Sequence, residues 1–194
     1  MSRADLVVGA DGLARCGWVG DDPEYSRYHD EEWGRPLHGD RALFEKLSLE
    51  GFQAGLSWIT ILRRRPAFRA AFRDFDIAAV AAFDDADVER LMGDAGIIRN
   101  RAKIEATISN ARITRELVAD DPGALDRLIW SYAPAPGARP SALSDVPAVT
   151  PEATALSTAL KRLGYRFVGP TTTYALMQSA GLVDDHVAGC WRAA

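Results

Sequence analysis

The chain has 194 residues with a net charge of −4, and 47% of them are hydrophobic, which is typical of one compact globular domain or two tightly joined lobes. No apolar run reaches the roughly 18 residues that a membrane-spanning helix needs, and the N-terminus lacks the apolar stretch of a secretory signal. These features exclude a membrane protein, and we expect a cytoplasmic protein without a membrane partner. The net charge does not indicate a nucleic-acid-binding protein, but basic residues are concentrated within 63–73 and again within 99–103.

We interpret residues 1–14, which are dominated by Gly, Ala and Asp, as a flexible N-terminal extension, and residues 15–194 as a single compact helical domain. Asp22 followed by Pro23 predicts the start of a helix, with Asp22 as its N-cap. Three large side chains would then share one face of this helix: Tyr25, Tyr28 and His29. Taken alone, this face is typical of an aromatic core patch.

Helical patterns continue along the chain. In the first half, four residues are predicted helix caps or helix starts: Asp40, Ser57, Asp76 and Asp84. Pro66 would kink or divide the helix that follows Ser57. In the second half, helices are predicted after Asp121, Thr150 and Gly169, with a surface loop at 133–150. No segment shows a sustained period of two with β-branched residues, so we predict an all-α fold.

The stretch 47–62 is mostly apolar and should lie largely in the core, yet it contains one carboxylate, Glu50, and one large aromatic residue, Trp58. A carboxylate in apolar surroundings is costly unless it is paired or has a function. Gly51 and Gly55 would allow another backbone or a flat ligand to approach closely. The alternative is a helix with Glu50 on its solvated face and Trp58 in the core.

Residues 91–118 indicate a helix–hairpin–helix arrangement. One helix should end near Met92, Gly93 should form the turn, Gly96 permits a positive φ, and a long helix should begin near Arg99. The turn would direct backbone N–H groups and a helix N-terminus outward, which makes a natural anion site. Three basic residues border it: Arg99, Arg101 and Lys103. We therefore predict that DNA phosphates bind here; the alternative is an ordinary helical hairpin with solvated basic side chains.

A candidate metal site uses both cysteines of the chain. His186 and Cys190 have the i, i+4 spacing that places two ligands on one helical or tightly turned face. Cys16 and His29 would complete a Cys2His2 set for one structural Zn(II) per chain, which would join the two ends of the chain. Four protein ligands leave the metal no open position, which argues against a zinc hydrolase. The alternative is two buried cysteines and two structural histidines.

Six segments resemble, in order, the signature segments of the 3-methyladenine DNA glycosylase I family: RCGWV, YHDEEWG, LEGFQAGLSW, DAGIIRNRAKI, FVGPTTTYALMQ and GLVDDHVAGC. The resemblance covers about Cys16 to Cys190. It implies a helical fold of the helix–hairpin–helix glycosylase superfamily, with zinc joining the ends. It implies a monofunctional enzyme of base-excision repair. No lysine stands where a Schiff-base nucleophile is suggested, so we expect no AP-lyase activity, and we expect a monomer. The enzyme would flip N3-methyladenine out of double-stranded alkylated DNA and hydrolyse its N-glycosidic bond.

Carried onto matching positions, the resemblance assigns zinc to the four ligands above. Glu50 would be the catalytic residue and, together with Tyr28, would hydrogen-bond the flipped base. Trp58 would stack on the base, and Trp18 and Tyr25 would complete an aromatic wall. We also expect Tyr28 to donate a hydrogen bond that helps to keep Glu50 ionised. Two residues depart from the family pattern: Phe52, where Gln is usual, and Pro170, where Thr is expected.

The turn at Gly55 and Leu56, beside Trp58, is a candidate to fill the gap that a flipped base leaves in the duplex. The alternative function is a non-catalytic, zinc-stapled module that recognises damaged DNA. Glu50 discriminates between the two functions, because a binding module could keep an aromatic cage without a carboxylate aimed at the base.

Overall fold

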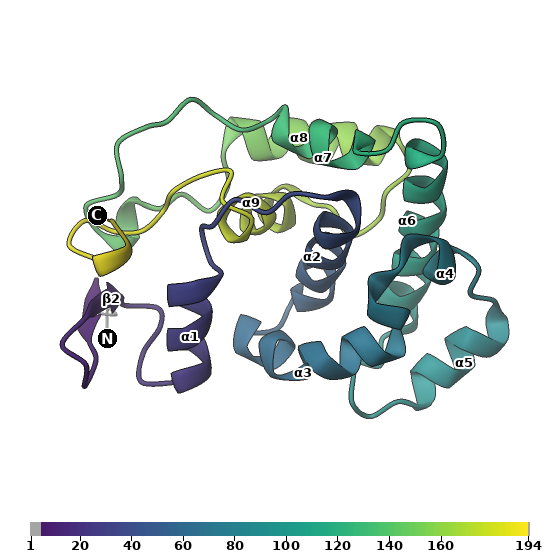
Figure 1. Ribbon diagram of the computed structural model, residues 1–194, viewed down its shortest axis with the longest axis horizontal. Helices are drawn as coiled ribbons and strands as arrows, with labels where there is room; N and C mark the ends of the chain where they lie inside the picture. Colours follow the sequence, from purple (N-terminus) through teal and green to yellow (C-terminus); the bar gives the residue numbers. More distant parts are fainter. Residues whose placement is uncertain (1–4, 194) are drawn as a thin grey trace.

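The computed structural model describes residues 5–193 and is built mostly of helices (Figure 1). In chain order the α-helices are α1 (Pro23–Glu31), α2 (Asp40–Gln53), α3 (Trp58–Ala71), α4 (Ile77–Ala81), α5 (Asp85–Gly93), α6 (Arg101–Val118), α7 (Ala124–Trp130), α8 (Pro151–Arg162) and α9 (Pro170–Ser179). Three short 3-10 helices are η1 (Arg73–Phe75), η2 (Leu143–Asp145) and η3 (Trp191–Ala193). Within the described residues, no helix combines the length and the apolar character that crossing a bilayer requires.

Two short strands lie at the start of the described chain, where none is predicted. β1 (Leu6–Val8) pairs antiparallel with β2 (Ala14–Cys16), with Leu6 opposite Cys16. The predicted helical fold is confirmed for most of the chain, but the described part of the expected extension over 1–14 contains a paired strand. Strands of three residues are too short to display a period of two, so a test for periodicity misses them.

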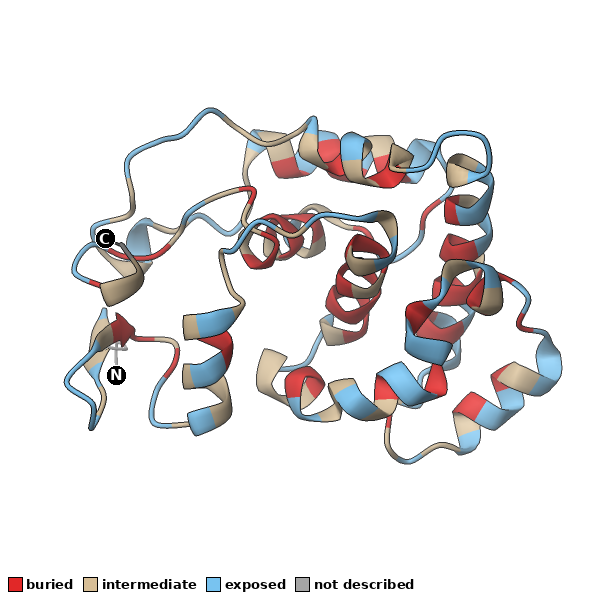
Figure 2. Ribbon diagram, in the orientation of Figure 1, coloured by how far each residue is buried: buried red, intermediate tan, exposed pale blue. Residues whose placement is uncertain are grey.

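Helix α2 is the centre of the fold and packs against α3, α6, α7 and α9 (Figure 1). Its residues from Leu43 onward are almost all buried (Figure 2). Phe52 lies among buried aromatic rings, with its centroid 4.7 Å from that of Phe68 and 5.8 Å from that of Phe72. An amide here would be buried among apolar rings, so Phe52 is a core residue in this chain. Pro170 is equally well placed, because the first residue of α9 needs no N–H for the helix.

Most predicted helix starts are confirmed. Side chains cap the helices that follow Asp22, Asp76, Asp84 and Thr150. Ser57 holds the N-cap position of α3, but its hydroxyl lies 2.9 Å from the Thr60 hydroxyl and does not cap a backbone N–H. Helix α3 continues through Pro66 as one element, so this proline does not divide it.

Asp40 and Asp121 differ from their predicted roles as caps. Asp40 is the first residue of α2, and its carboxylate accepts hydrogen bonds from the backbone N–H groups of Gly123 (2.6 Å) and Asp126 (3.0 Å). It therefore caps α7, whose N-cap residue is Gly123. The Asp121 carboxylate instead accepts from Arg127. A cap that comes from 83 residues away leaves no local pattern in the sequence.

Candidate functional site

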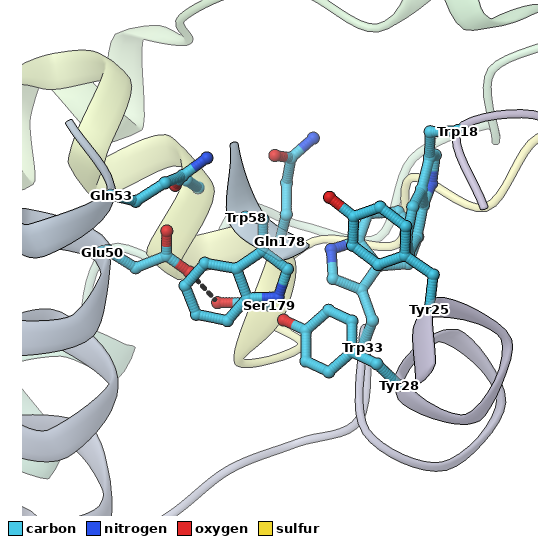
Figure 3. Close-up of a pocket in the computed structure, with 10 residues that line it drawn as sticks. Trp18, Tyr25, Tyr28, Trp33, Glu50, Gln53, Trp58, Gln178 and Ser179 are labelled. Carbon is cyan, nitrogen blue, oxygen red and sulfur yellow. Dashed lines mark hydrogen bonds between the residues drawn. The ribbon is translucent and has the colours of Figure 1, made fainter. Parts of the chain in front are cut away.

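A cavity of about 210 Å³ lies between α1, α2, the start of α3 and α9 (Figure 3). The lining residues are Trp18, Tyr25, Tyr28, Trp33, Glu50, Gln53, Trp58, Ala175, Gln178 and Ser179. All five residues predicted to contact a base are therefore brought together in this cavity. They come from two helices, the start of a third and the segment before α1, so the fold assembles the cavity from separate parts of the chain.

Glu50 is almost completely buried, with 3% of its surface exposed. Among residues 5–193, its one hydrogen-bond donor is Ser179, whose hydroxyl donates to Glu50 Oε1 over 3.0 Å. Burial raises the pKa of Glu50 to about 7, against the opposing effects of the Lys46 charge and the Ser179 hydrogen bond. The alternative of a solvated Glu50 is excluded, and its carboxyl group exchanges a proton near neutral pH.

Ser179 takes the place that was predicted for Tyr28 as the hydrogen-bond donor to Glu50. The Tyr28 hydroxyl points toward Ser179 in Figure 3, and burial raises the pKa of Tyr28 well above its ordinary value. Ser179 is 129 positions from Glu50, so no spacing in the sequence relates the two residues. Only the fold brings this serine to the carboxylate.

Five lining residues have no predicted site role: Trp33, Gln53, Ala175, Gln178 and Ser179. Gln53 could have been found, because it follows Glu50 by three positions on the same helix and so shares its face. The Gln178 side chain is hydrogen-bonded to a residue that does not line the cavity, because its Nε2 donates to Asp185 Oδ2 over 2.8 Å. The same carboxylate oxygen accepts from the Tyr174 hydroxyl over 2.5 Å, which fixes the orientation of the Gln178 amide.

Aromatic rings form most of the wall of the cavity. Trp18 packs edge to face, with centroid distances of 5.5 Å to Tyr25 and 5.1 Å to Trp33. Tyr28 and Trp58 form a second pair, 5.5 Å apart. The indole N–H of Trp58 is buried and has no acceptor within the described chain. The faces of such rings attract cations, so the cavity suits a flat ligand that carries positive charge.

The four predicted metal ligands also lie together. The ligand atoms of Cys16, His29, His186 and Cys190 are within 4.8 Å of one another, and all four residues are buried. Cys190 Sγ lies 3.4 Å from His29 Nε2 and 3.6 Å from His186 Nδ1. Two sulfurs and two ring nitrogens thus converge on one point, and this donor set can hold a metal ion in tetrahedral geometry.

The residues behind His29 support the same interpretation. His29 Nδ1 lies 2.8 Å from Asp30 Oδ1, and Asp30 accepts further hydrogen bonds from Arg15 Nη2 (2.7 Å) and Trp191 Nε1 (3.0 Å). A carboxylate behind a histidine fixes its tautomer and orientation, which is the usual arrangement for a metal-binding imidazole. His186 Nε2, in contrast, is buried without a partner in the described chain.

The Cys2His2 cluster and the cavity share a wall. The Trp18 ring lies 5.4 Å from the His29 ring, and the Trp33 ring lies 4.7 Å from the His186 ring, between centroids. Both tryptophans also line the cavity. The cluster sits where β2 meets the C-terminal η3, and Figure 1 shows the two ends of the described chain side by side here. Joining the chain ends therefore also positions one side of the cavity.

The segment from α5 to α6 forms two helices joined by residues 94–100. Helix α6 begins at Arg101, and Arg99 lies in the loop before it. Gly96 does not take a positive φ. A glycine is needed here for another reason, because a Cβ at this position would lie 3.0 Å from the Cβ of Ala67.

The three basic residues of this segment are placed differently from one another. Arg99 is exposed, and Arg101 is 47% exposed at its side chain, with an ion pair of 2.6 Å to Glu89. Lys103 is buried and donates to the backbone carbonyls of Phe52 (2.8 Å) and Ala54 (2.6 Å). The expectation that Lys103 borders an external anion site is therefore wrong, because it satisfies the carbonyl groups at the end of α2.

Gly55 and Leu56 form an exposed turn between α2 and α3. Gly55 has φ +83°, a conformation that favours glycine, and Leu56 is 41% exposed. Gln53 and Trp58, on either side of this turn, both line the cavity. A large apolar side chain thus stands in solvent beside the cavity.

Comparison with known proteins agrees with this geometry. The family model of methyladenine glycosylases matches residues 18–193. DNA-3-methyladenine glycosylase 1 of Escherichia coli (strain K12) is 48% identical over 180 residues, which cover 92% of this chain and 96% of the relative. A crystal structure of a 3-methyladenine DNA glycosylase I has a TM-score of 0.87 at 47% identity, over 91% of this chain and 98% of the other. The 3-methyladenine DNA glycosylase I of Staphylococcus aureus has a TM-score of 0.86 at 37% identity, over 91% and 95%. The chain therefore belongs to the methyladenine glycosylase family.

Proposed function

We propose that the chain removes N3-methyladenine from alkylated double-stranded DNA by hydrolysing its N-glycosidic bond, after the base has flipped into the cavity. The observation that carries this proposal is the buried carboxylate of Glu50 inside an aromatic cavity. The family of the chain and the names of its relatives support the same activity.

The lesion and the cavity are complementary in charge. Methylation at N3 makes the base cationic while it is attached to deoxyribose. Each aromatic face attracts a desolvated cation by roughly 0.5–2 kcal/mol. An ionised Glu50 adds ionic attraction and can accept a hydrogen bond from an N–H of the adenine edge. Neutral adenine gains less from both interactions, so the cavity selects the methylated base.

Cleavage of the bond requires little help, because the cationic base leaves as a neutral molecule. The electron pair of the C1′–N9 bond moves to the base, and the deoxyribose is left as a cation that water captures with loss of a proton. Positive charge passes from the base to the sugar, and the negative potential of Glu50 stabilises it throughout. No lysine is among the described residues that line the cavity, which supports a monofunctional enzyme without AP-lyase activity.

We further propose that DNA docks on the loop between α5 and α6 in a helix–hairpin–helix mode, with Leu56 filling the gap in the duplex. Arg99 and Arg101 are exposed at this loop, and the N-terminus of α6 favours phosphate. Phosphate contacts are independent of sequence and sensitive to salt. Arg101→Ala should therefore weaken binding equally across sequences, and an altered lesion preference would instead place this residue at the base.

The Cys2His2 cluster is proposed to bind one structural Zn(II) per chain through Cys16, His29, His186 and Cys190. Bound there, the ion would have no open position and would supply stability rather than chemistry. The same proposal takes residues 15–194 as a single compact domain that works as a monomer in the cytoplasm.

The function is tested by incubating the purified full-length protein with methylated DNA and identifying the released bases by chromatography. N3-methyladenine should appear from methylated DNA and not from untreated DNA, and Glu50→Gln protein prepared in the same way is the matched control. Tight binding of methylated DNA without release of any base would support the non-catalytic recognition module instead. Strand cleavage at the abasic site would contradict the monofunctional mechanism.

A further inference from the structure

A lysine is buried directly behind the aromatic wall of the cavity. Lys46 is on α2, one helical turn before Glu50, and only 8% of its surface is exposed. Its Nζ lies 5.3 Å from the ring centroid of Tyr28 and 5.7 Å from that of Trp58. Lys46 is not among the residues that line the cavity, whereas both of these rings are. Within the described chain no hydrogen bond is formed by Lys46 Nζ, and the faces of Tyr28 and Trp58 are its close neighbours.

Two carboxylates, Glu50 on α2 and Glu32 just after α1, attract this ammonium group through their charges, although neither forms an ion pair with it among the described residues. Burial lowers the pKa of Lys46, and the charges of Glu50 and then Glu32 oppose that effect. Glu32, at the end of α1, is itself paired with Arg65 of α3, with Arg65 Nη2 2.7 Å from Glu32 Oε1. Glu45 adds a weaker attraction to Lys46, and Arg65 a repulsion. This set contains two acids and two bases. Lys46 and Glu50 are buried, Glu32 and Arg65 are partly exposed, and of the four only Glu50 lines the cavity.

We propose that Lys46 is a positioning residue whose charge keeps Glu50 ionised in the cavity and so sets the lower pH limit of base excision. This inference rests on the role proposed for Glu50. The groups that face Glu50 are Lys46 on its own helix, Ser179 on α9 and Tyr28 on α1. Only Lys46 among them carries a charge.

Removal of the Lys46 charge has two effects of opposite sign. Burial already raises the pKa of Glu50 to about 7, and without Lys46 this pKa rises further, so Glu50 is protonated at neutral pH and attracts a cationic base less. The faces of Tyr28 and Trp58, no longer shared with a resident cation, attract the base more. Excision should therefore fall near and below pH 7 and recover, or exceed that of the natural chain, near pH 9. A purely structural role for Lys46 would lower excision at every pH.

The experiment compares the natural chain with Lys46→Met, a substitution of similar length without charge. Single-turnover release of N3-methyladenine is measured from pH 5.5 to 9, and Glu50 is titrated by NMR of ¹³C-labelled glutamate, with its resonance assigned through Glu50→Gln. We expect the Glu50 midpoint to rise by about one pH unit, release at pH 6.5 to fall up to about tenfold, and release at pH 9 to stay within about twofold. Lys161→Met, which removes an exposed charge from α8, is the matched control and should leave both curves unchanged.

An unchanged Glu50 midpoint in Lys46→Met would overturn the inference, as would a uniform loss of release at all pH values. If Lys46→Met does not fold, Lys46→Gln, which can be solvated by water in the same space, is measured in its place with the same expectations. A shifted Glu50 midpoint without any change in release would overturn the role proposed for Glu50 in excision, and not the coupling between the two side chains. Failure of this inference and failure of the proposed function are therefore distinguishable.

Discussion

The base cavity and the Cys2His2 cluster lie back to back, with Trp18 and Trp33 between them, yet their polar atoms are satisfied in different ways. In the cluster, the sulfur and nitrogen atoms face one another within 4.8 Å. Behind them, the His29 ring is hydrogen-bonded to the Asp30 carboxylate, which also accepts a hydrogen bond from Arg15. One buried atom of the cluster, His186 Nε2, has no partner in the described chain, but the four atoms that could hold an ion face one another.

The cavity is left incomplete. Glu50 is buried with a single hydrogen-bond donor, Ser179, and the indole N–H of Trp58 is buried with no acceptor in the described chain. A buried charge or N–H group that lacks hydrogen-bond partners reduces the stability of the fold, because burial has also removed the water that would solvate it. The difference is consistent with our proposals that the cluster stabilises the fold and that the cavity takes a ligand with positive charge and hydrogen-bonding groups.

The largest expected effect comes from breaking the cluster. Cys190→Ala removes one of the four proposed zinc ligands, so the protein should not retain zinc. The free energy of unfolding should fall by roughly 3–5 kcal/mol, the upper end of single-residue effects. Base binding should also fall, because Trp18 and Trp33 rest on the histidines of the cluster. Elemental analysis and a melting curve measure the first two changes. Natural protein without stoichiometric metal would contradict the assignment, and Ala188→Gly, at an exposed position beside the cluster, is the control.

The second largest effect should be a dependence of the free energy of unfolding on pH, caused by the Glu50 carboxylate. The pKa of Glu50 is raised by burial from 4.5 to about 7 in the folded chain. A group with a raised folded pKa contributes stability that is fully present below its unfolded pKa and is lost as the pH rises through its folded pKa. The free energy of unfolding should therefore decrease between about pH 4.5 and 7 by up to about 3 kcal/mol relative to Glu50→Gln.

Denaturant titrations of the natural chain and of Glu50→Gln at pH 5 and pH 8 measure this difference. The variant should be close to the natural chain at pH 5 and more stable at pH 8. Equal stability at both values would mean that Glu50 is not desolvated, and a less stable variant at pH 8 would show that the carboxylate holds the fold together.

Much of this site follows from local sequence. Glu50 and Trp58 are eight positions apart in one apolar stretch, so their unusual environment can be recognised before the fold is known. The i, i+4 spacing of His186 and Cys190 likewise follows from the chemistry of metal ligands. Helix starts such as Asp84 are equally local, because a cap and its helix are adjacent.

What could not be predicted depends on where distant segments meet. Ser179 reaches Glu50 and Asp40 reaches α7 only through the packing of helices that are far apart in sequence. Lys103 is a further example. Its position near Arg101 in the sequence indicates a basic cluster, but the sequence does not show that the backbone carbonyl groups at the end of α2 lie beside it. Local patterns show which residues are chemically unusual, and tertiary packing decides which of them face a ligand.

Removal of the charge from the cavity should reduce excision without damage to the neighbouring cluster. Glu50→Gln keeps the shape of the side chain and an acceptor but loses the attraction for a cationic base, and we expect single-turnover release of N3-methyladenine to fall about a hundredfold. Zinc content should stay at that of the natural chain, which separates the two sites. Release at the natural rate would refute the argument from charge, and loss of zinc would show that the sites are not independent.

The smallest effect should come from Ser179→Ala, which changes the cavity only by the one hydrogen bond that Glu50 receives. Ser179 lowers the pKa of Glu50, so without its hydroxyl the carboxylate is ionised only at higher pH. A hydrogen bond to a charged group contributes roughly 1.5 kcal/mol, so release at pH 7 should fall about five- to tenfold and recover near pH 9. Thr158→Ala removes an exposed hydroxyl that bonds its own helix on α8, and is the matched control for release. If Ser179→Ala released the base at the natural rate across this pH range, the serine would only fill space, and the charge of Glu50 would depend on Lys46 alone.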